Sequence, residues 1–119
     1  MAAKSLQIKR VYEAPSPTDG QRVLVDRIWP RGISKQKLHG AVWLKEIAPS
    51  AELRKWFDHR PERWAQFRTR YAKELDGSPD AVAQLRAMRT QGPVTLLYSA
   101  RDEEHNQAVA LVKYLESRG

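Results

Sequence analysis

The sequence predicts a single small α/β domain over residues 1–119, with a short, mostly parallel sheet flanked by helices in a Rossmann-like layering. Two observations predict this class. Short apolar runs typical of strands occur near both ends of the chain, and the clearest of them, residues 94–98, leads directly into an amphipathic segment. Between the first and last runs, apolar residues recur at helical spacing. Strands that alternate with helices favour parallel pairing.

The first third of the chain contains two expected strands. Residues 7–12 alternate polar and apolar side chains, as in a half-buried strand, and residues 13–20 form a loop rich in Pro, Ser, Asp and Gly. Residues 21–27 form a short apolar run that suits a buried strand, and Trp29-Pro30-Arg31-Gly32 ends it. Ser34 can cap a short helical turn through Leu38.

The middle of the chain is expected to be helical. The stretch around Trp43 and Leu44 is ambiguous, and Ser50 can then cap a first helix. Pro61 suits the first position of a second helix that ends before Gly77. A third helix ends at Gly92-Pro93. The predicted inward-facing residues are Leu53, Trp56 and Phe57 in the first helix, Trp64, Phe67, Tyr71 and Leu75 in the second, and Val82, Leu85 and Met88 in the third.

The last strand and helix form the clearest unit. Val94–Tyr98 is expected to be a buried strand, and Asp102 can cap the helix that follows. The inward face of that helix is predicted to carry Ala108, Leu111, Val112 and Leu115. His105 lies three residues before Ala108, so we expect it on the same face, in the first turn of the helix.

Charge and composition restrict the function classes. The chain has 21 Lys and Arg against 14 Asp and Glu, a formal net charge of +7 that favours anionic partners. Residues 1–47 carry a net +5, residues 48–92 a net +3 and residues 93–119 a net −1, with no block of basic residues, so nucleic acid is not the favoured partner. No cysteine is present, which excludes disulfides and thiol chemistry.

Several sites and partners are not expected. No apolar run approaches the roughly 20 residues that cross a bilayer, so we expect a cytoplasmic protein with no membrane partner. No Gly-rich nucleotide-binding motif or hydrolase nucleophile elbow is present. The three histidines, His39, His59 and His105, lack the spacing of metal ligands. We therefore expect neither a metal nor a cofactor.

The end of the second strand is the first candidate site. Ligands of open α/β sheets bind beyond the carboxyl ends of the parallel strands. Arg27 and Arg31 could hold a carboxylate or phosphate through paired hydrogen bonds, and the Trp29 indole could stack on a ring. Asp26 is a further candidate, although it could equally pair with an arginine while Trp29 fills the edge of the core.

The end of the last strand is the second candidate site. Ser99 could donate to a phosphate or act as a weak nucleophile, and Arg101 and Asn106 could bind the same ligand. An imidazole at His105 has a pKa near neutrality, which suits a general acid or base. A half-buried histidine that ties the turn to the sheet is an equally good interpretation of His105.

The aromatic and basic residues of the central helices have a simpler interpretation. Rings and cations together could bind single-stranded nucleic acid. However, the rings form the apolar stripe and the arginines lie mostly on the opposite face, as in a core with a solvated surface. His59, in the turn between two helices, is interpreted as structural.

The chain resembles the YeaO-like branch of the DUF488 proteins, whose name denotes a domain of unknown function. The similar segments are residues 22–35, 43–50, 53–57, 67–71 and 94–108, within a likeness that covers about residues 6–116. The resemblance implies a small single α/β domain and includes both strand ends. Longer relatives place cysteines near the last strand and helix, where this chain has Ser99, His105 and Asn106.

The first functional hypothesis is a pocket at the strand ends for a small anionic ligand of nucleotide or phosphate type. If the protein is an enzyme, which the residues leave open, His105 is the expected acid or base and the arginines hold the anion. The alternative is a nucleic-acid- or protein-binding module that uses the basic surface of residues 4–73 without catalysis. A purely structural subunit also stays open.

Overall fold

A parallel sheet organises the molecule. The computed structural model describes residues 6–38 and 40–117, and within these ranges the sheet has four strands in the order β1-β4-β2-β3. All neighbouring strands are parallel, so their carboxyl ends lie at the same edge. The strands are β1 (Leu6–Arg10), β2 (Gln21–Leu24), β3 (Val42–Trp43) and β4 (Val94–Tyr98). The predicted α/β class is thereby confirmed.

The central strand is the last one in the chain. β4 pairs with β1 from Leu6↔Val94 to Arg10↔Tyr98 and with β2 from Gln21↔Val94 to Leu24↔Leu97. All five of its residues are buried, as a continuous apolar run predicts for a strand covered on both faces. β1 and β2 are shorter than the sequence predicted.

Local signals of the sequence explain where the helices begin and end. The helices are α1 (Ala51–Phe57), α2 (Trp64–Asp76), α3 (Pro79–Gln91) and α4 (Gln107–Ser117), and short 3-10 turns lie at Pro17–Asp19, Lys45–Ile47 and Pro61–Arg63. As predicted, the Ser50 hydroxyl accepts a hydrogen bond from the Leu53 N–H and caps α1. The Ser50 hydroxyl also donates to the Glu74 carboxylate, which ties the start of α1 to α2.

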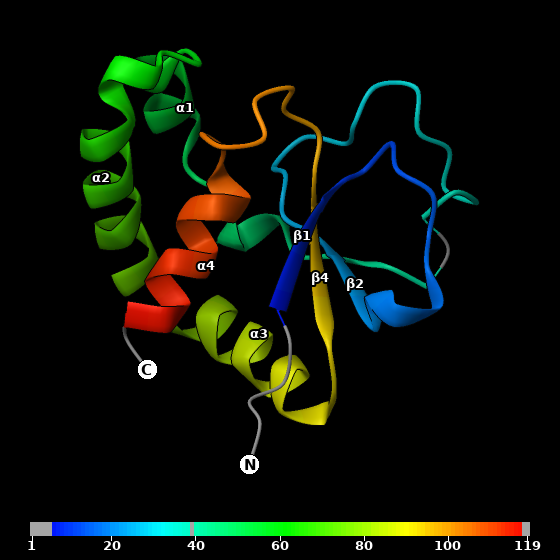
Figure 1. Ribbon diagram of the computed structural model, residues 1–119. Helices are drawn as coiled ribbons and strands as arrows, with labels where there is room; N and C mark the ends of the chain where they lie inside the picture. Colours follow the sequence, from blue (N-terminus) through cyan, green and yellow to red (C-terminus); the bar gives the residue numbers. More distant parts are fainter. Residues whose placement is uncertain (1–5, 39, 118–119) are drawn as a thin grey trace.

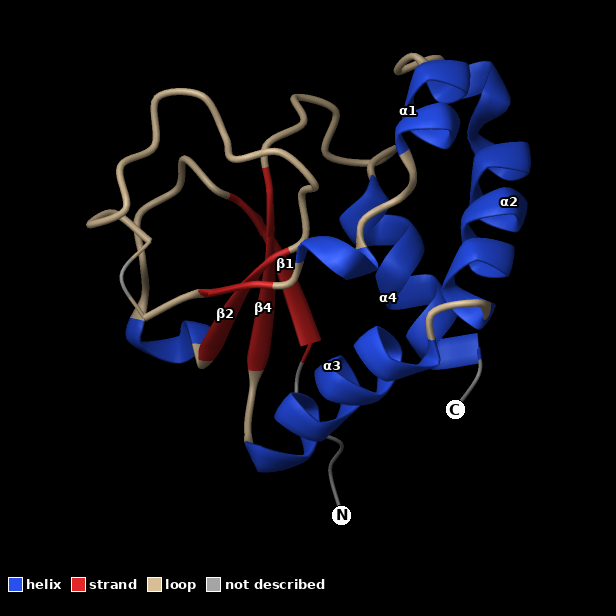
Figure 2. Cartoon of the chain, turned by 180° about the vertical axis from the view of Figure 1, so that it is seen from behind, coloured by secondary structure: helices blue, strands red, loops and turns tan. Residues whose placement is uncertain are grey.

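The two faces of the sheet are covered differently. All four α-helices lie on one face, where they enclose the main core, and irregular chain covers the other (Figures 1 and 2). On that second face, Leu24 and Leu97 pack with Ile33 and Leu38 in a smaller cluster. The segment after β2 contains Pro30 and Gly32 and makes turns instead of a helix, so the helices flank the sheet on one side only.

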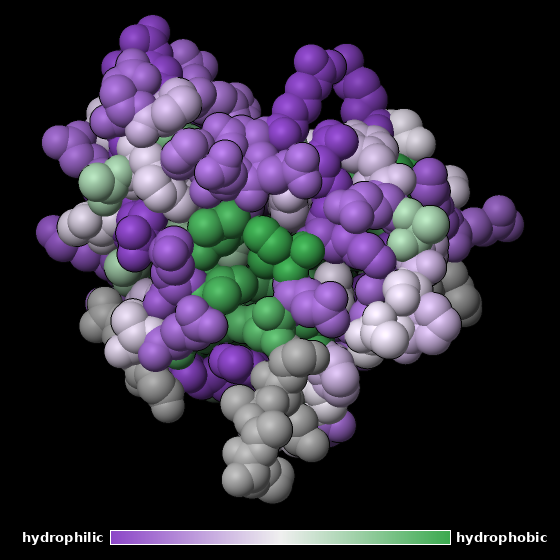
Figure 3. Space-filling view, in the orientation of Figure 1, coloured by the Kyte–Doolittle hydropathy of each residue, from purple (hydrophilic) through white to green (hydrophobic). Residues whose placement is uncertain are grey.

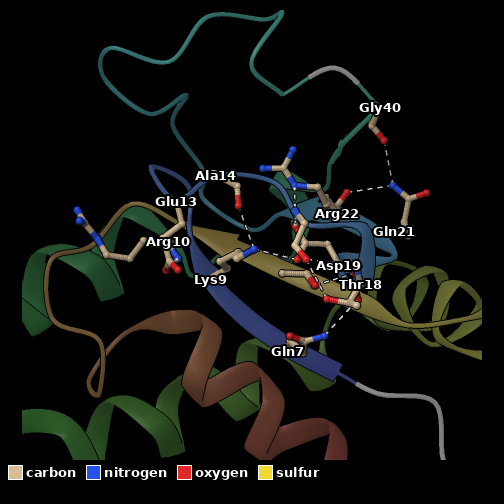
Figure 4. A network of polar contacts seen from close by, with 12 residues as sticks. Gln7, Lys9, Arg10, Glu13, Ala14, Thr18, Asp19, Gln21, Arg22 and Gly40 are labelled. Atoms are coloured by element: carbon tan, nitrogen blue, oxygen red, sulfur yellow. Dashed lines mark hydrogen bonds and ion pairs between the residues drawn. The ribbon is translucent and has the colours of Figure 1, made fainter.

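A buried ion pair closes the amino-terminal end of the second face (Figure 4). Asp19 is 2% exposed, and its carboxylate accepts a 2.9 Å hydrogen bond from the Lys9 ammonium. Burial raises the pKa of Asp19, but the hydrogen bond and charge of Lys9 and the charge of Arg22 outweigh it, so this pKa lies below its ordinary value. The Thr95 hydroxyl donates to the Asp19 carbonyl, which fixes the turn against β4.

The open edge of the sheet is partly apolar. Figure 3 shows an apolar area near β1, framed by hydrophilic side chains. Leu6 and Ile8 of β1 and Val112 of α4 are only partly buried where they pack against the main core. Within the described residues, no helix is both long and apolar enough to span a membrane.

Candidate functional site

A pocket of about 820 Å³ lies at the carboxyl ends of β2 and β4. Three segments line it: the loop after β2, the end of α1 with the turn that follows, and the loop between β4 and α4. The structure brings together all the site residues that the sequence predicted, because all of them line this pocket: Asp26, Arg27, Trp29, Arg31, Ser99, Arg101, His105 and Asn106.

Asp26 joins the ends of the two strands. Its side chain is nearly buried, and its carboxylate accepts hydrogen bonds from the Ser99 N–H (3.1 Å), the Ser99 hydroxyl and the Gln107 side-chain amide. Burial raises the pKa of this carboxyl above its ordinary value, and the hydrogen bonds from Ser99 and Gln107 offset only part of that effect. The hydrogen bond to Asp26 also fixes the Ser99 hydroxyl, which the sequence predicted as a candidate phosphate donor or weak nucleophile.

Arg27 and Trp29 are also engaged within the protein. The Arg27 Nε and Nη2 donate to the carbonyls of Pro49 and Ala48, at 3.1 and 3.2 Å, and so link the loop after β2 to the segment before α1. Two of the five guanidinium N–H bonds are used in this way, and three remain for a ligand. The Trp29 indole N–H donates to the Ile33 carbonyl.

The loop after β4 corrects one prediction. Asp102 does not cap the last helix: its Oδ1 accepts from the N–H groups of Glu104 and His105, and the chain makes an Asx turn before α4 begins at Gln107. Asn106 supplies the cap, because its Oδ1 accepts from the Val109 N–H at 3.0 Å. His105 therefore precedes the helix and does not lie on its inward face.

His105 is nevertheless held firmly at the pocket. Its Nδ1 lies 3.0 Å from Oδ2 of Asp102, and its ring meets the Trp64 ring edge-on at a centroid distance of 5.3 Å. Hydrogen bonds from the Glu104 and His105 backbone N–H groups lower the pKa of Asp102, and the His105 ring contributes in the same direction. An ionised Asp102 accepts a hydrogen bond from the Nδ1–H of His105, so Nε2 is the ring nitrogen that is not bound to Asp102.

Sequence reasoning missed the third wall of the pocket. Arg54, Lys55, Asp58 and His59, at the end of α1 and in the following turn, line it together with the strand ends. The sequence placed Arg54 and Lys55 on a solvated surface and gave His59 a structural role. No local pattern shows that the end of α1 lies beside the ends of β2 and β4, since that proximity arises from tertiary packing.

Arg54 differs from Arg27 in its bonding. Arg54 is half-buried, it is attracted to the charge of Asp26, and its Nε is a buried nitrogen without a hydrogen-bond acceptor. A buried donor of a charged group that lacks an acceptor is costly. This nitrogen is enclosed by the protein, so the missing acceptor is a feature of the packing around Arg54.

The pocket has an excess of positive charge. Five Arg and Lys side chains line it against three aspartates, and each aspartate has a partner within the protein: Asp26 with Ser99, Asp58 with Arg60, and Asp102 with His105. Among the residues that the structure describes, no three His, Asp or Glu side chains come together as a metal-binding group. His39 lies outside those residues.

Comparisons with known proteins place the chain in a family. A family model described as "Inactive DUF488-N3 subclade" matches residues 5–118. The chain belongs to this family. The resemblance stated from the sequence is thereby confirmed, and the DUF488-N3i match spans both strand ends and all three walls of the pocket.

Two similar proteins are described as uncharacterised. An uncharacterised protein of Mycobacterium tuberculosis is 44% identical over 113 residues, which cover 95% of this chain and 95% of that protein. The uncharacterised protein YeaO of Escherichia coli is 43% identical over 113 residues, 95% of this chain and 98% of YeaO. No solved structure matches the chain.

Proposed function

We propose that the protein binds a small oxyanion, of phosphate or carboxylate type, in the pocket at the carboxyl ends of β2 and β4. Parallel α/β sheets commonly place ligands at this edge. The excess of positive side chains in the pocket supports an anionic ligand, and its volume of about 820 Å³ leaves space for an organic group attached to the anion.

The excess of arginine and lysine side chains over aspartates that already have partners is the observation that carries the proposal. Guanidinium groups bind carboxylates and phosphates through paired hydrogen bonds, and such bonds are stronger than those between neutral groups. The Arg54 Nε itself is buried, so an oxyanion in the pocket would approach the guanidinium from the exposed part of this half-buried side chain. Arg31, Lys55 and Arg101 are exposed cations that line the same pocket and can approach the same ligand.

Calorimetric titration with pyrophosphate, phosphate and acetate tests the proposal on the full chain. We expect pyrophosphate to bind and Arg54→Gln to weaken its binding about tenfold or more, because one charge-assisted contact is lost. Arg68→Gln is the matched control, since Arg68 is an exposed arginine of α2 that does not line the pocket. No binding of any of the three anions, or equal loss in both variants, would contradict the proposal.

A second candidate function is acid–base catalysis at the same site. The Asp102–His105 hydrogen bond favours it, because a carboxylate on Nδ1 orients an imidazole whose Nε2 can exchange a proton. Two observations favour binding alone: Ser99 donates its hydroxyl to Asp26, and the description of the family contains the word inactive. Turnover of 4-nitrophenyl phosphate that is lost in His105→Gln would favour catalysis.

The alternative of a nucleic-acid- or protein-binding surface has weaker support. On the outer side of the helices, the guanidinium groups of Arg63 and Arg70 lie over the Trp56 ring, 5.3 and 4.2 Å from its centroid. These cations already pack against the protein. Binding to single-stranded DNA that falls steeply with salt, and that Arg54→Gln does not change, would favour this alternative over the pocket.

A further inference from the structure

The turn between α1 and α2 has an unusual backbone. Asp58 and His59 are consecutive residues with positive φ, at 49° and 52°, and no other residue except glycine has a positive φ in the described ranges. A left-handed conformation costs a residue with a side chain about 1–2 kcal/mol. Asp58 is the left-handed cap that ends α1, and its N–H donates to the Arg54 carbonyl. Asp and His adopt this conformation more readily than most residues, although glycine or asparagine is more common at the end of a helix.

The strained turn is part of the pocket wall. Both Asp58 and His59 line the pocket, and His59 is exposed. Backbone strain of this kind concentrates at binding sites, where it holds a side chain in a required position. An exposed imidazole buries little apolar surface, so a histidine at this position contributes little to the stability of the fold.

A series of ring contacts connects this turn to the second imidazole of the pocket. The His59 ring lies 6.4 Å from the ring of Phe57, and Phe57 lies 6.0 Å from Trp64. Trp64 in turn contacts His105 at 5.3 Å. Phe57 is buried, so both imidazoles contact one aromatic cluster that is anchored in the core.

We infer that His59 is a ligand-binding residue of the pocket, held by the Asp58–His59 turn so that it donates to a tetrahedral, multiply charged oxyanion of phosphate type. His105 donates to the same anion through Nε2 in its imidazolium form, because its Nδ1–H is bound to Asp102. The inference rests on the proposed function and narrows its ligand class. Arginine forks suit planar carboxylates and phosphates equally, whereas N–H donors from two imidazoles in addition to the cations serve an anion with several outward oxygens.

Substitutions at the turn separate the imidazole from the backbone strain. His59→Asn removes the imidazole and keeps a residue that accepts the left-handed conformation. Asp58→Gly relieves strain and keeps the imidazole. We expect His59→Asn to weaken pyrophosphate binding about tenfold in calorimetry and Asp58→Gly to raise the thermal unfolding midpoint by a few degrees while the imidazole remains available. Arg68→Gln again serves as the charge control.

Imidazole proton NMR of the full chain reports the contact directly. On titration with pyrophosphate, we expect the His59 and His105 ring resonances to shift together, and acetate to leave the His59 resonance nearly unchanged. Binding by the wild type with an unchanged affinity in His59→Asn, or with no shift at His59, would overturn the inference and leave the proposed anion site intact. Absence of pyrophosphate, phosphate and acetate binding by the wild type would overturn the proposed function and the inference with it.

Discussion

The walls of the pocket use their polar groups in opposite ways. At the strand ends, Asp26, Ser99 and Arg27 direct hydrogen bonds into the protein and hold its segments together. At the end of α1, Arg54 has a buried nitrogen without an acceptor and His59 sits on a strained turn. The difference indicates that lining a pocket does not define a role: one wall mainly holds the pocket together, and the side chains of the other wall are less constrained by internal hydrogen bonds.

The largest expected effect is at Asp26. Asp26→Ala leaves the partly buried Ser99 and Gln107 donors without an acceptor, so we expect the free energy of unfolding to fall by about 2–4 kcal/mol. Urea denaturation measures it. The asparagine side chain of Asp26→Asn has the same shape and retains one acceptor oxygen, so the loss in free energy of unfolding should be clearly smaller. Equal stability of the wild type and Asp26→Ala would show that this wall does not build the pocket.

Arg27 and Arg54 sharpen the comparison directly. Arg27→Gln removes two hydrogen bonds to backbone carbonyls near the surface, and we expect a loss of about 1 kcal/mol in the free energy of unfolding. Arg54→Gln removes a guanidinium with an unpaired Nε, so its stability should stay within about 0.5 kcal/mol of the wild type. If denaturation gave the reverse order, the roles assigned to the two arginines would be exchanged.

The pocket carboxylates should titrate in opposite directions from their ordinary values. Burial raises the pKa of Asp26, while backbone hydrogen bonds lower the pKa of Asp102. Carbon NMR of the two carboxyl groups should therefore show Asp26 taking up its proton at a higher pH than Asp102.

These shifts also give the signs of two stability changes. Because the pKa of Asp26 is higher in the folded protein, its protonation stabilises the folded state. This contribution to the free energy of unfolding is complete below the unfolded pKa near 3.8 and is lost as pH rises through the folded pKa. The stability difference between the wild type and Asp26→Asn should therefore widen as pH falls towards 4. The contribution of Asp102 has the opposite sign and is lost as pH falls below about 4. A difference that narrows on acidification would contradict the assignment for Asp26.

The smallest change in stability is expected at Lys55. This side chain is exposed on α1 and lines the pocket. Lys55→Gln should leave the free energy of unfolding within about 0.5 kcal/mol of the wild type and weaken pyrophosphate binding a few-fold, because an exposed cation contributes mainly through screened attraction. A large loss in the free energy of unfolding would instead show that Lys55 stabilises the fold.

The sequence predicted elements whose signals are local. The run Val94–Tyr98 and the Ser50 cap were identified correctly because a buried strand and a helix start depend on neighbouring residues. The start of α4 was wrong because Asp102 and Asn106 are both residues that cap helices, and the choice between them depends on the path of the loop. Likewise, the rule for parallel sheets predicted that the strand ends lie together, and they do line one pocket, whereas the contribution of α1 follows only from packing.

The position of β4 has a consequence for synthesis of the chain. β4 lies between β1 and β2 in the sheet. Within the described residues, β4 is the only strand that pairs with β1. Until residues 94–98 leave the ribosome, the apolar faces of α1, α2 and α3 have no complete sheet to cover. The nascent protein must therefore delay the folding of this sheet until β4 has been synthesised, and a ribosome that stalls before residue 94 would release a chain with exposed apolar helices for chaperones and proteases.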